Sequence, residues 1–357
     1  MLKKEVRTIA TQKNVRGLED WLQIDFLQTN LEMITTQLGL SLSDFNYSEQ
    51  GLTYYPFDCC YSLGDVKIYG MDYYSVTDTA RYMLVLSGKG CQFYREYASE
   101  ETLKSLLKTF FNDYGDTLKV TRFDVCIDDF NQKPYYTPSQ LLKFCEKKRF
   151  HYGKSTTYQT YGNKQQGVTL YLKPAGADDR LRIYDKHMEQ AKQLGIRPKD
   201  YEFPSWIRYE VEFHREKAHL LAKKYAYDDS DIKELVKGYL KEKLVFYSDD
   251  SFQKVAQRWI EFLGQSEPFK LVIKKEKSPL LDKFEWYQFK GSLAIYKAIK
   301  FLEENQIYPK SIDTLDEALE KTMFSIELSD ELKKYVLLYG REDLLSEITL
   351  NTKQRKK

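Results

Sequence analysis

Several features that mark common classes of protein are missing from this sequence of 357 residues. The five cysteines are an odd number, with no Cys-x-x-Cys pair and no histidine at zinc-binding spacing, so neither a disulfide framework nor a zinc site is expected. No apolar run reaches the roughly eighteen residues of a membrane-spanning helix, and no signal-peptide core follows the N-terminus. The glycine-rich phosphate loop of ATP-binding proteins is also absent. We therefore expect a cytoplasmic protein without a membrane anchor.

An excess of positive charge is missing too. The chain carries 55 basic and 53 acidic residues, a net charge of +2. Nucleic-acid binding would therefore need local basic patches. Three runs qualify, although each alone is more often a solvated surface: Lys147 and Lys148 with Arg149 and His151; Lys274, Lys275 and Lys277; and the terminal KQRKK.

Aromatic residues are plentiful, with 29 Tyr and 20 Phe. They suit half-buried strands and surfaces that stack on bases. Alternating strand patterns prevail up to about residue 225, and helical spacing prevails after it. This order predicts an α+β protein: a mainly antiparallel sheet domain with covering helices, followed by a helical C-terminal region. We assign 1–17 to a flexible arm, 18–225 to a catalytic domain, and 226–357 to the helical region, which could recognise a DNA site or mediate dimerisation.

Two local predictions concern the sheet. An apolar strand over residues 81–87 is followed by Gly88 and Gly90, which predicts a tight turn and a hairpin partner strand at Cys91–Glu96. QFYRE also resembles RIYDK about ninety residues later, RFDV resembles RYEV, and VKIY resembles VTLY more loosely. These echoes predict that the sheet domain is a pseudo-duplicated unit.

The stretch RLRIYDKHME, Arg180–Glu189, carries the strongest chemical signal. Its period-two pattern puts Arg182, Tyr184 and Lys186 on one face of a strand. One more tyrosine on a sheet would be unremarkable, but cations on both sides favour a phenolate and stabilise charge on a phosphate. Tyr184 is therefore a candidate nucleophile, with Arg182 and Lys186 assisting it.

Two other strands offer carboxylates. Asp124 and Asp128 share a face of RFDVCIDD, and Glu210 and Glu212 share a face of RYEVEF. Such oxygen ligands suit Mg²⁺ or Mn²⁺. Alternatively, each pair could form salt bridges with Arg122 or Arg208. The His-hydrophobe-His triplet that many DNA-nicking enzymes use for their metal is absent.

In this order and spacing, LSGKGCQFYRE, TRFDVCIDD, RLRIYDKHMEQ and IRYEVEFHRE resemble the Rep_trans family, which contains rolling-circle plasmid replication initiators and related relaxases of integrative conjugative elements. The resemblance covers residues 20–225. It implies a metal-dependent nicking and joining enzyme that becomes attached to the 5′ phosphate of origin DNA through Tyr184. Its acidic motifs fall on Asp124 and Glu210, with Asp128 and Glu212 as further candidates. It also implies a homodimer and recruitment of a host helicase.

We therefore expect Tyr184 to attack a hairpin or single-stranded site, initiating rolling-circle replication or conjugative transfer. Contacts to DNA are expected from five cations, namely Arg180, Arg122, Arg208, Lys147 and Lys148. Two alternatives remain: a sequence-specific DNA-binding protein without catalysis, and a metal-dependent nuclease that uses water.

Overall fold

The structure is a computed structural model, and it describes residues 14–27, 29–52, 57–71, 81–97, 102–163, 167–272, 283, 287, 292–307, 315–338 and 340–353. The chain divides into two compact units, residues 1–273 and 274–357. Most of the expected arm lies outside the described residues, but residues 15–17 belong to the first strand. The basic runs at 274–277 and at the C-terminus lie outside the described residues as well, except for Lys353.

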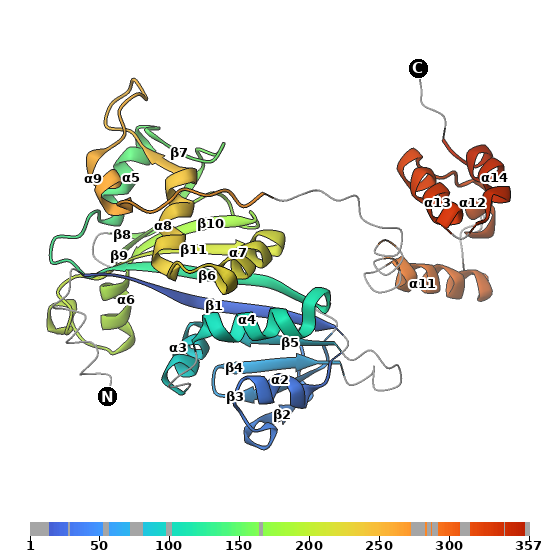
Figure 1. Cartoon of the computed structure of the whole chain (residues 1–357), viewed down its shortest axis with the longest axis horizontal. Helices are drawn as coiled ribbons and strands as arrows, with labels where there is room; N and C mark the ends of the chain where they lie inside the picture. The colour runs from blue at the N-terminus through green and yellow to red at the C-terminus, as the bar shows by residue number, and fades with distance from the viewer. Residues whose placement is uncertain are drawn as a thin grey trace. The chain divides into compact units, whose positions relative to one another are not determined.

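A ten-stranded antiparallel sheet forms the centre of the first unit (Figure 1). This confirms the α+β prediction. Its strand order is β2-β3-β4-β5-β1-β6-β11-β10-β9-β8. The strands are β1 (Val15–Leu27), β2 (Asn46–Ser48), β3 (Cys59–Leu63), β4 (Val66–Gly70), β5 (Arg81–Leu86), β6 (Leu118–Asp129), β8 (Tyr158–Asn163), β9 (Gly167–Leu172), β10 (Asp179–Asp185) and β11 (Ile207–His214). A separate two-stranded sheet pairs β7 (Phe150–Tyr152) with β12 (Leu244–Phe246).

The ten-stranded sheet consists of two halves with the same topology. In each half the first strand, β1 or β6, lies at the centre of the whole sheet, and four further strands run in sequence from the outer edge back to pair with it. β1 and β6 then pair with each other along most of their length. The topology thus agrees with a pseudo-duplicated unit.

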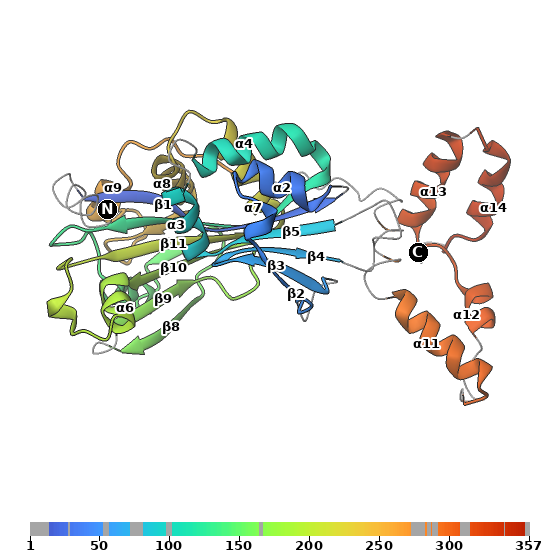
Figure 2. The same cartoon turned by 90° about the horizontal axis from the view of Figure 1, so that it is seen from below.

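The helices of the first unit cover mainly one face of this sheet, and Figure 2 shows α2, α4, α7 and α8 along that face. The helices are α2 (Leu31–Gln37), α3 (Gly88–Tyr97), α4 (Leu103–Tyr114), α5 (Pro138–Glu146), α6 (Lys186–Gln193), α7 (Arg215–Tyr227), α8 (Ile232–Lys243) and α9 (Gln257–Leu263). Leu22, Ile127 and Ile183 of the strands pack with the helices in one large core. Thr137 caps α5 within a capping box with Gln140.

Two local predictions were wrong. Residues 91–96 form no hairpin strand, because α3 begins at Gly88. Its buried residues Cys91 and Tyr94 are three apart, which is the spacing of a helix. Gly90 allows a close approach, since a Cβ there would lie 2.6 Å from the carbonyl oxygen of Asp65. The proposed echo between QFYRE and RIYDK therefore pairs a helix with a strand. β10 also ends at Asp185, so Lys186 is the first residue of α6 and not a strand residue.

The first unit extends beyond the border expected near residue 225. Tyr239 of α8 and Trp259 and Phe262 of α9 are buried in the main core, so these two helices belong with the sheet. The second unit contains α11 (Ser292–Glu304), α12 (Leu315–Lys321), α13 (Ile326–Leu338) and α14 (Leu345–Leu350).

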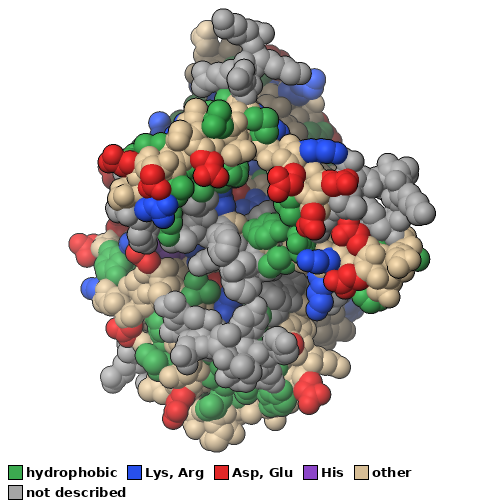
Figure 3. Space-filling model, turned by 90° about the vertical axis from the view of Figure 1, so that its right-hand side faces the viewer, with side chains coloured by type: hydrophobic (Ala, Val, Ile, Leu, Met, Phe, Trp, Pro, Cys, Tyr) green, Lys and Arg blue, Asp and Glu red, His purple; other side chains and the backbone are tan. Residues whose placement is uncertain are grey.

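Within the described ranges, no helix combines the length and apolar character needed to cross a membrane. On the face drawn in Figure 3, acidic and basic side chains are scattered among one another.

Candidate active site

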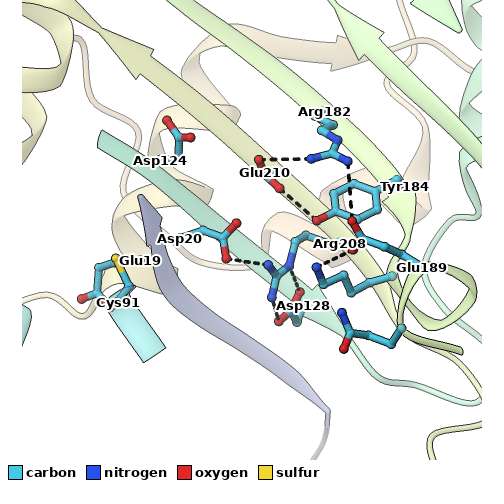
Figure 4. A network of polar contacts seen from close by, with 12 residues as sticks. Glu19, Asp20, Cys91, Asp124, Asp128, Arg182, Tyr184, Glu189, Arg208 and Glu210 are labelled. Atoms are coloured by element: carbon cyan, nitrogen blue, oxygen red, sulfur yellow. Dashed lines mark hydrogen bonds and ion pairs between the residues drawn. The ribbon is translucent and has the colours of Figure 1, made fainter. Parts of the chain in front are cut away.

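Tyr184 and the predicted acids lie on the face of the sheet opposite the main core. Three adjacent strands bring them together: Tyr184 of β10 is opposite Arg208 of β11, and Arg208 is opposite Asp128 of β6. One pair along, Arg182 is opposite Glu210. Because alternate residues of a strand share a face, this register turns all five side chains to the same side. Figure 4 shows the resulting polar network.

The Tyr184 side chain is buried, at 3% exposure, but its surroundings are polar. Its hydroxyl donates a hydrogen bond of 3.1 Å to Oε2 of Glu210. The guanidinium of Arg182 lies 4.0 Å from the centre of the phenol ring, and Nζ of Lys186 lies 5.6 Å from it. Burial raises the pKa of Tyr184 well above its usual range, and the charge of Glu210 adds to this, while Arg208 and Arg182 oppose it. The phenol is therefore protonated at neutral pH.

Arg208 is the best-fixed cation of the site. It is 4% exposed, donates to both oxygens of Asp128 at 2.7 and 2.8 Å, and donates to Asp20 at 2.7 Å. A two-pronged bond of this kind fixes the orientation of the guanidinium plane. Asp128 is thus occupied in holding Arg208 beside the tyrosine.

Asp20 is a site residue that the sequence analysis missed. The pairing of β1 with β6 shifts register between Glu19 and Trp21, which leaves Asp20 as the extra residue of a β-bulge. Asp20 consequently reaches Arg208 on the site face, whereas Glu19 accepts a hydrogen bond from Tyr225 of α7 on the helical face. The only signal in the sequence is the pair of adjacent acids, because alternation does not reveal a bulge.

Arg182 is held more loosely than Arg208. Its Nη atoms lie 3.7 Å from Glu210 and 3.9 Å from Glu189, and its buried Nε has no hydrogen-bond partner among the described residues. Lys186 forms an ion pair with Glu189 one turn along α6. Arg182 is therefore a cation with donors to spare next to the tyrosine.

The remaining acids are partly neutralised. Arg122 donates to both oxygens of Asp124 at 3.0 and 3.1 Å through Nε, and the Arg122 guanidinium stacks 4.2 Å from the Trp21 ring. Burial raises the pKa of Asp124 against the effect of Arg122, and Glu210 and Glu212 raise it further. Burial likewise raises the pKa of Glu210, and Asp20 adds to the rise. The acids of this site therefore repel one another.

Carboxylates are the side chains of this site that could bind a metal ion. Among the described residues, no group of three or more metal-binding side chains converges, so no cage built entirely of protein exists there. Mg²⁺, however, is usually held by one or two carboxylates together with substrate phosphates. Glu210 interacts unfavourably with both Asp20 and Asp124, and a cation would relieve that repulsion. The donor set fits an ion that arrives with a phosphate.

Of the other predicted site residues, Arg180 and Glu212 lie in the row of Asp124, next to the row of Arg182 and Glu210. Glu212 is 3.9 Å from His214. Arg180 shares the face of Tyr184, two positions before Arg182, and stacks 3.8 Å from the ring of Tyr171. Lys147 and Lys148 follow α5, whose buried residues Leu141 and Cys145 pack into the core on the helical face. These two lysines are therefore not brought together with Tyr184.

Fold and site together define an α+β protein whose antiparallel sheet presents a tyrosine among carboxylates and guanidinium groups. Comparison with protein families agrees with this class. The Rep_trans model, described as replication initiation factor, matches residues 118–310, and a model described as rolling circle replication initiation protein N-terminal domain matches residues 18–112. Since the first match covers more than half of the chain, the protein belongs to the Rep_trans family of replication initiation factors, which confirms the resemblance.

A solved structure of a rolling circle replication initiator protein from Geobacillus stearothermophilus has a similar fold. The TM-score is 0.58 at 23% sequence identity, and the match covers 72% of this chain and 98% of that chain. A search of curated proteins found no match.

Proposed function

We propose that this protein cuts and rejoins one strand of origin DNA through a covalent link between Tyr184 and the 5′ phosphate. The observation that carries the proposal is the hydrogen bond of 3.1 Å from the Tyr184 hydroxyl to Glu210, made beside Arg182 and Arg208. A nucleophile, a carboxylate and cations within one small cluster are the parts that attack on a phosphodiester needs. Membership of the Rep_trans family supports the same chemistry.

In the cutting step, the Tyr184 oxygen bonds to phosphorus, and the bond from phosphorus to the 3′ oxygen breaks. The phenolic proton leaves along the hydrogen bond to Glu210 and passes to solvent, while the departing 3′ oxygen takes up a proton. Arg182, whose Nε has no hydrogen-bond partner among the described residues, offsets the charge that develops on the phosphate oxygens. Attack by a free 3′ hydroxyl reverses the step, so cutting and joining use one chemistry.

Glu210 and Asp124 would hold Mg²⁺ or Mn²⁺ when DNA is bound, with Asp20 as a further neighbour. The ion would polarise the scissile phosphate and lower the cost of phenolate formation. Because Tyr184 is 3% exposed, this side of the sheet has to open for DNA to reach the phenol. We propose a hairpin or single-stranded target in the origin and, on the family resemblance, action as a homodimer with a host helicase.

The test is a nicking assay on a supercoiled plasmid that carries the origin, with Mg²⁺ or Mn²⁺ present. We expect relaxed plasmid and a DNA-linked protein that survives denaturation with detergent, and we expect neither from Tyr184→Phe. An adduct that persists in Tyr184→Phe would disprove the assignment of the nucleophile. Nicking without an adduct would favour the water-using nuclease, and binding without nicking would favour a non-catalytic DNA-binding protein.

A further inference from the structure

The site face of the sheet continues outward from Tyr184 over the last two strands. Thr169 of β9 is opposite Tyr184, and Tyr161 of β8 is opposite Thr169, so these three residues form one row that ends at the sheet edge. In the next row, Gln159 is opposite Tyr171, which is opposite Arg182. All six residues of β8 are exposed.

Aromatic rings and guanidinium groups follow one another along this surface. The Tyr161 and Tyr171 rings meet edge to face, 5.6 Å apart. The guanidinium of Arg180 lies 3.8 Å from the Tyr171 ring centre, and that of Arg182 lies 6.0 Å from the Tyr171 ring centre and 4.0 Å from the Tyr184 ring centre. The series therefore runs without a break from an exposed edge to the proposed nucleophile.

Arg180 is held in a defined position. It donates to the carbonyl oxygen of Lys173 at 3.3 Å and to the side chain of Gln159 at 3.0 Å. Tyr161 is 59% exposed, and the buried Nε of Arg182 has no hydrogen-bond partner among the described residues. The exposed Tyr161 ring, the ordered Arg180 guanidinium and the Nε of Arg182 together suit a ligand with flat aromatic faces and anionic oxygens.

We propose that the single strand of DNA entering the active site lies across β8, β9 and β10, with bases stacked on Tyr161 and Tyr171 and phosphates bound by Arg180 and Arg182. The inference rests on the proposed function, because it names the path by which the scissile phosphate reaches Tyr184. Stacking on aromatic side chains together with cations along the backbone is how proteins bind single strands without reading their sequence. A duplex fits poorly, because its bases are stacked on one another and cannot lie on the rings.

The surface could instead pair with a second copy of the chain, since β8 is an edge strand. Its site-facing residues argue against this. The edge strand reads YQTYGN, and its mainly polar side chains lack the apolar centre of a stable subunit interface.

The experiment measures fluorescence anisotropy of a labelled oligothymidylate of about 12 nucleotides, within the range of single-strand sites. All proteins carry Tyr184→Phe, and EDTA is present, so binding is measured without chemistry. We expect Tyr161→Ala to weaken binding by about ten-fold, the loss of one base stack, and Tyr161→Trp to preserve it. Arg180→Ala should lower the slope of log K against log salt by about 0.7, the value for one phosphate on a single strand.

The matched control is Tyr47→Ala. Tyr47 is 50% exposed on β2, the opposite edge strand of the same sheet, and its ring centre lies 5.2 Å from that of Tyr61. We expect it to leave oligothymidylate binding unchanged. Equal effects of the two alanine changes would overturn the proposed path. So would a Tyr161→Ala protein that binds normally but shows a smaller mass in sedimentation equilibrium, because β8 would then be an interface between copies.

Failure of this path and failure of the proposed function can be told apart. If wild-type protein nicks the plasmid and forms the adduct while Tyr161→Ala binds oligothymidylate normally, the path is wrong and the nicking function stands. If Tyr161→Ala loses binding but no adduct forms with the wild-type protein, the surface binds single strands and the nicking function is wrong.

Discussion

The two halves of the sheet have the same topology but opposite chemistry on the face away from the main core. In the second half, the row Tyr184, Arg208 and Asp128 crosses β10, β11 and β6. In the first half, the corresponding row is Tyr69, Met83 and Asp25 across β4, β5 and β1. Tyrosine and aspartate are the same in both rows, and the middle residue changes from arginine to methionine.

The next row repeats the pattern. Arg182, Glu210 and Cys126 in the second half correspond to Lys67, Val85 and Gln23 in the first. On β5, therefore, two apolar residues replace the buried Arg208 and Glu210. Met83 and Val85 form a small cluster with Phe57, against which Tyr69 packs. One backbone arrangement thus carries a buried charge network in one half and an apolar cluster at the corresponding positions of the other.

The largest effect is expected when Arg208 is replaced by methionine, the residue at the corresponding position of the first half. Arg208→Met leaves Asp128 and Asp20 without their cation on a buried face. Removing one partner of a buried ion pair typically costs about 3–5 kcal/mol of unfolding free energy, which urea denaturation at neutral pH would measure. The double variant Arg208→Met/Asp128→Asn should recover part of this loss. If the single change cost under about 1 kcal/mol, as a conservative core change can, the network would not be what separates the halves.

How much of this was predictable from sequence can be judged at particular residues. Strict alternation put Tyr184, Asp124 and Glu210 on the correct faces of three strands, because the side-chain period of a strand is two wherever pairing is regular. It failed at Asp20, where a bulge breaks that period. It also failed at Lys186, because the strand ends at Asp185 and Lys186 is the first residue of α6.

Long-range packing was out of reach for a different reason. The amphipathic patterns of α8 and α9 were visible, but a pattern does not say which core receives the apolar side. The duplication was inferred from sequence similarities that do not correspond in the structure. Strand pairing places the stretch from Lys67 to Tyr69 of β4 at the position of Arg182 to Tyr184 of β10, and not at that of the VTLY stretch of β9. Only strand pairing identifies corresponding positions when short stretches resemble each other by chance.

The second prediction removes the acid that has no counterpart in the first half. Glu210→Gln keeps a hydrogen-bond acceptor for Tyr184 but removes the negative charge, so nicking should fall by about a hundred-fold or more, in line with losing several kcal/mol of metal-based stabilisation. Stability should not fall, because a buried charge with a raised pKa is removed. Glu212→Gln is the control: this residue pairs with His214 and should matter far less. Equal losses of nicking in the two variants would mean that the total negative charge of the strand, and not Glu210 itself, supports the reaction.

A third prediction concerns how the two corresponding strands begin. β4 follows a tight turn at Gly64, whereas β10 starts at buried Asp179, bound by Lys173 and Lys217. Burial opposes ionisation, but the two lysines outweigh it and lower the pKa of Asp179 to about 2. Its stabilising effect is therefore full above its unfolded pKa of about 4 and is lost as pH falls through about 2.

Asp179→Asn should accordingly cost about 2 kcal/mol of unfolding free energy at neutral pH, the value of a shift of this size. Urea denaturation of both proteins at several pH values measures the difference. We expect it to shrink as the pH drops from 4 towards 2. A difference that does not change with pH would mean that Asp179 acts through packing and not through its charge.

The smallest effect is expected at the tyrosine of the first half. Tyr69→Phe should leave nicking and the DNA adduct unchanged and should shift stability by no more than about 0.5 kcal/mol. The position lies in the row of Met83, next to Val85, so neither an arginine nor a carboxylate is opposite it. Burial raises the pKa of Tyr69, and the neighbouring Cys60 raises it further. A smaller amount of adduct in Tyr69→Phe would mean that both halves take part in the chemistry. If Tyr69→Phe forms the normal amount of adduct and Tyr184→Phe forms none, the residues around Tyr184 determine the chemistry, and the position of a tyrosine in the sheet does not.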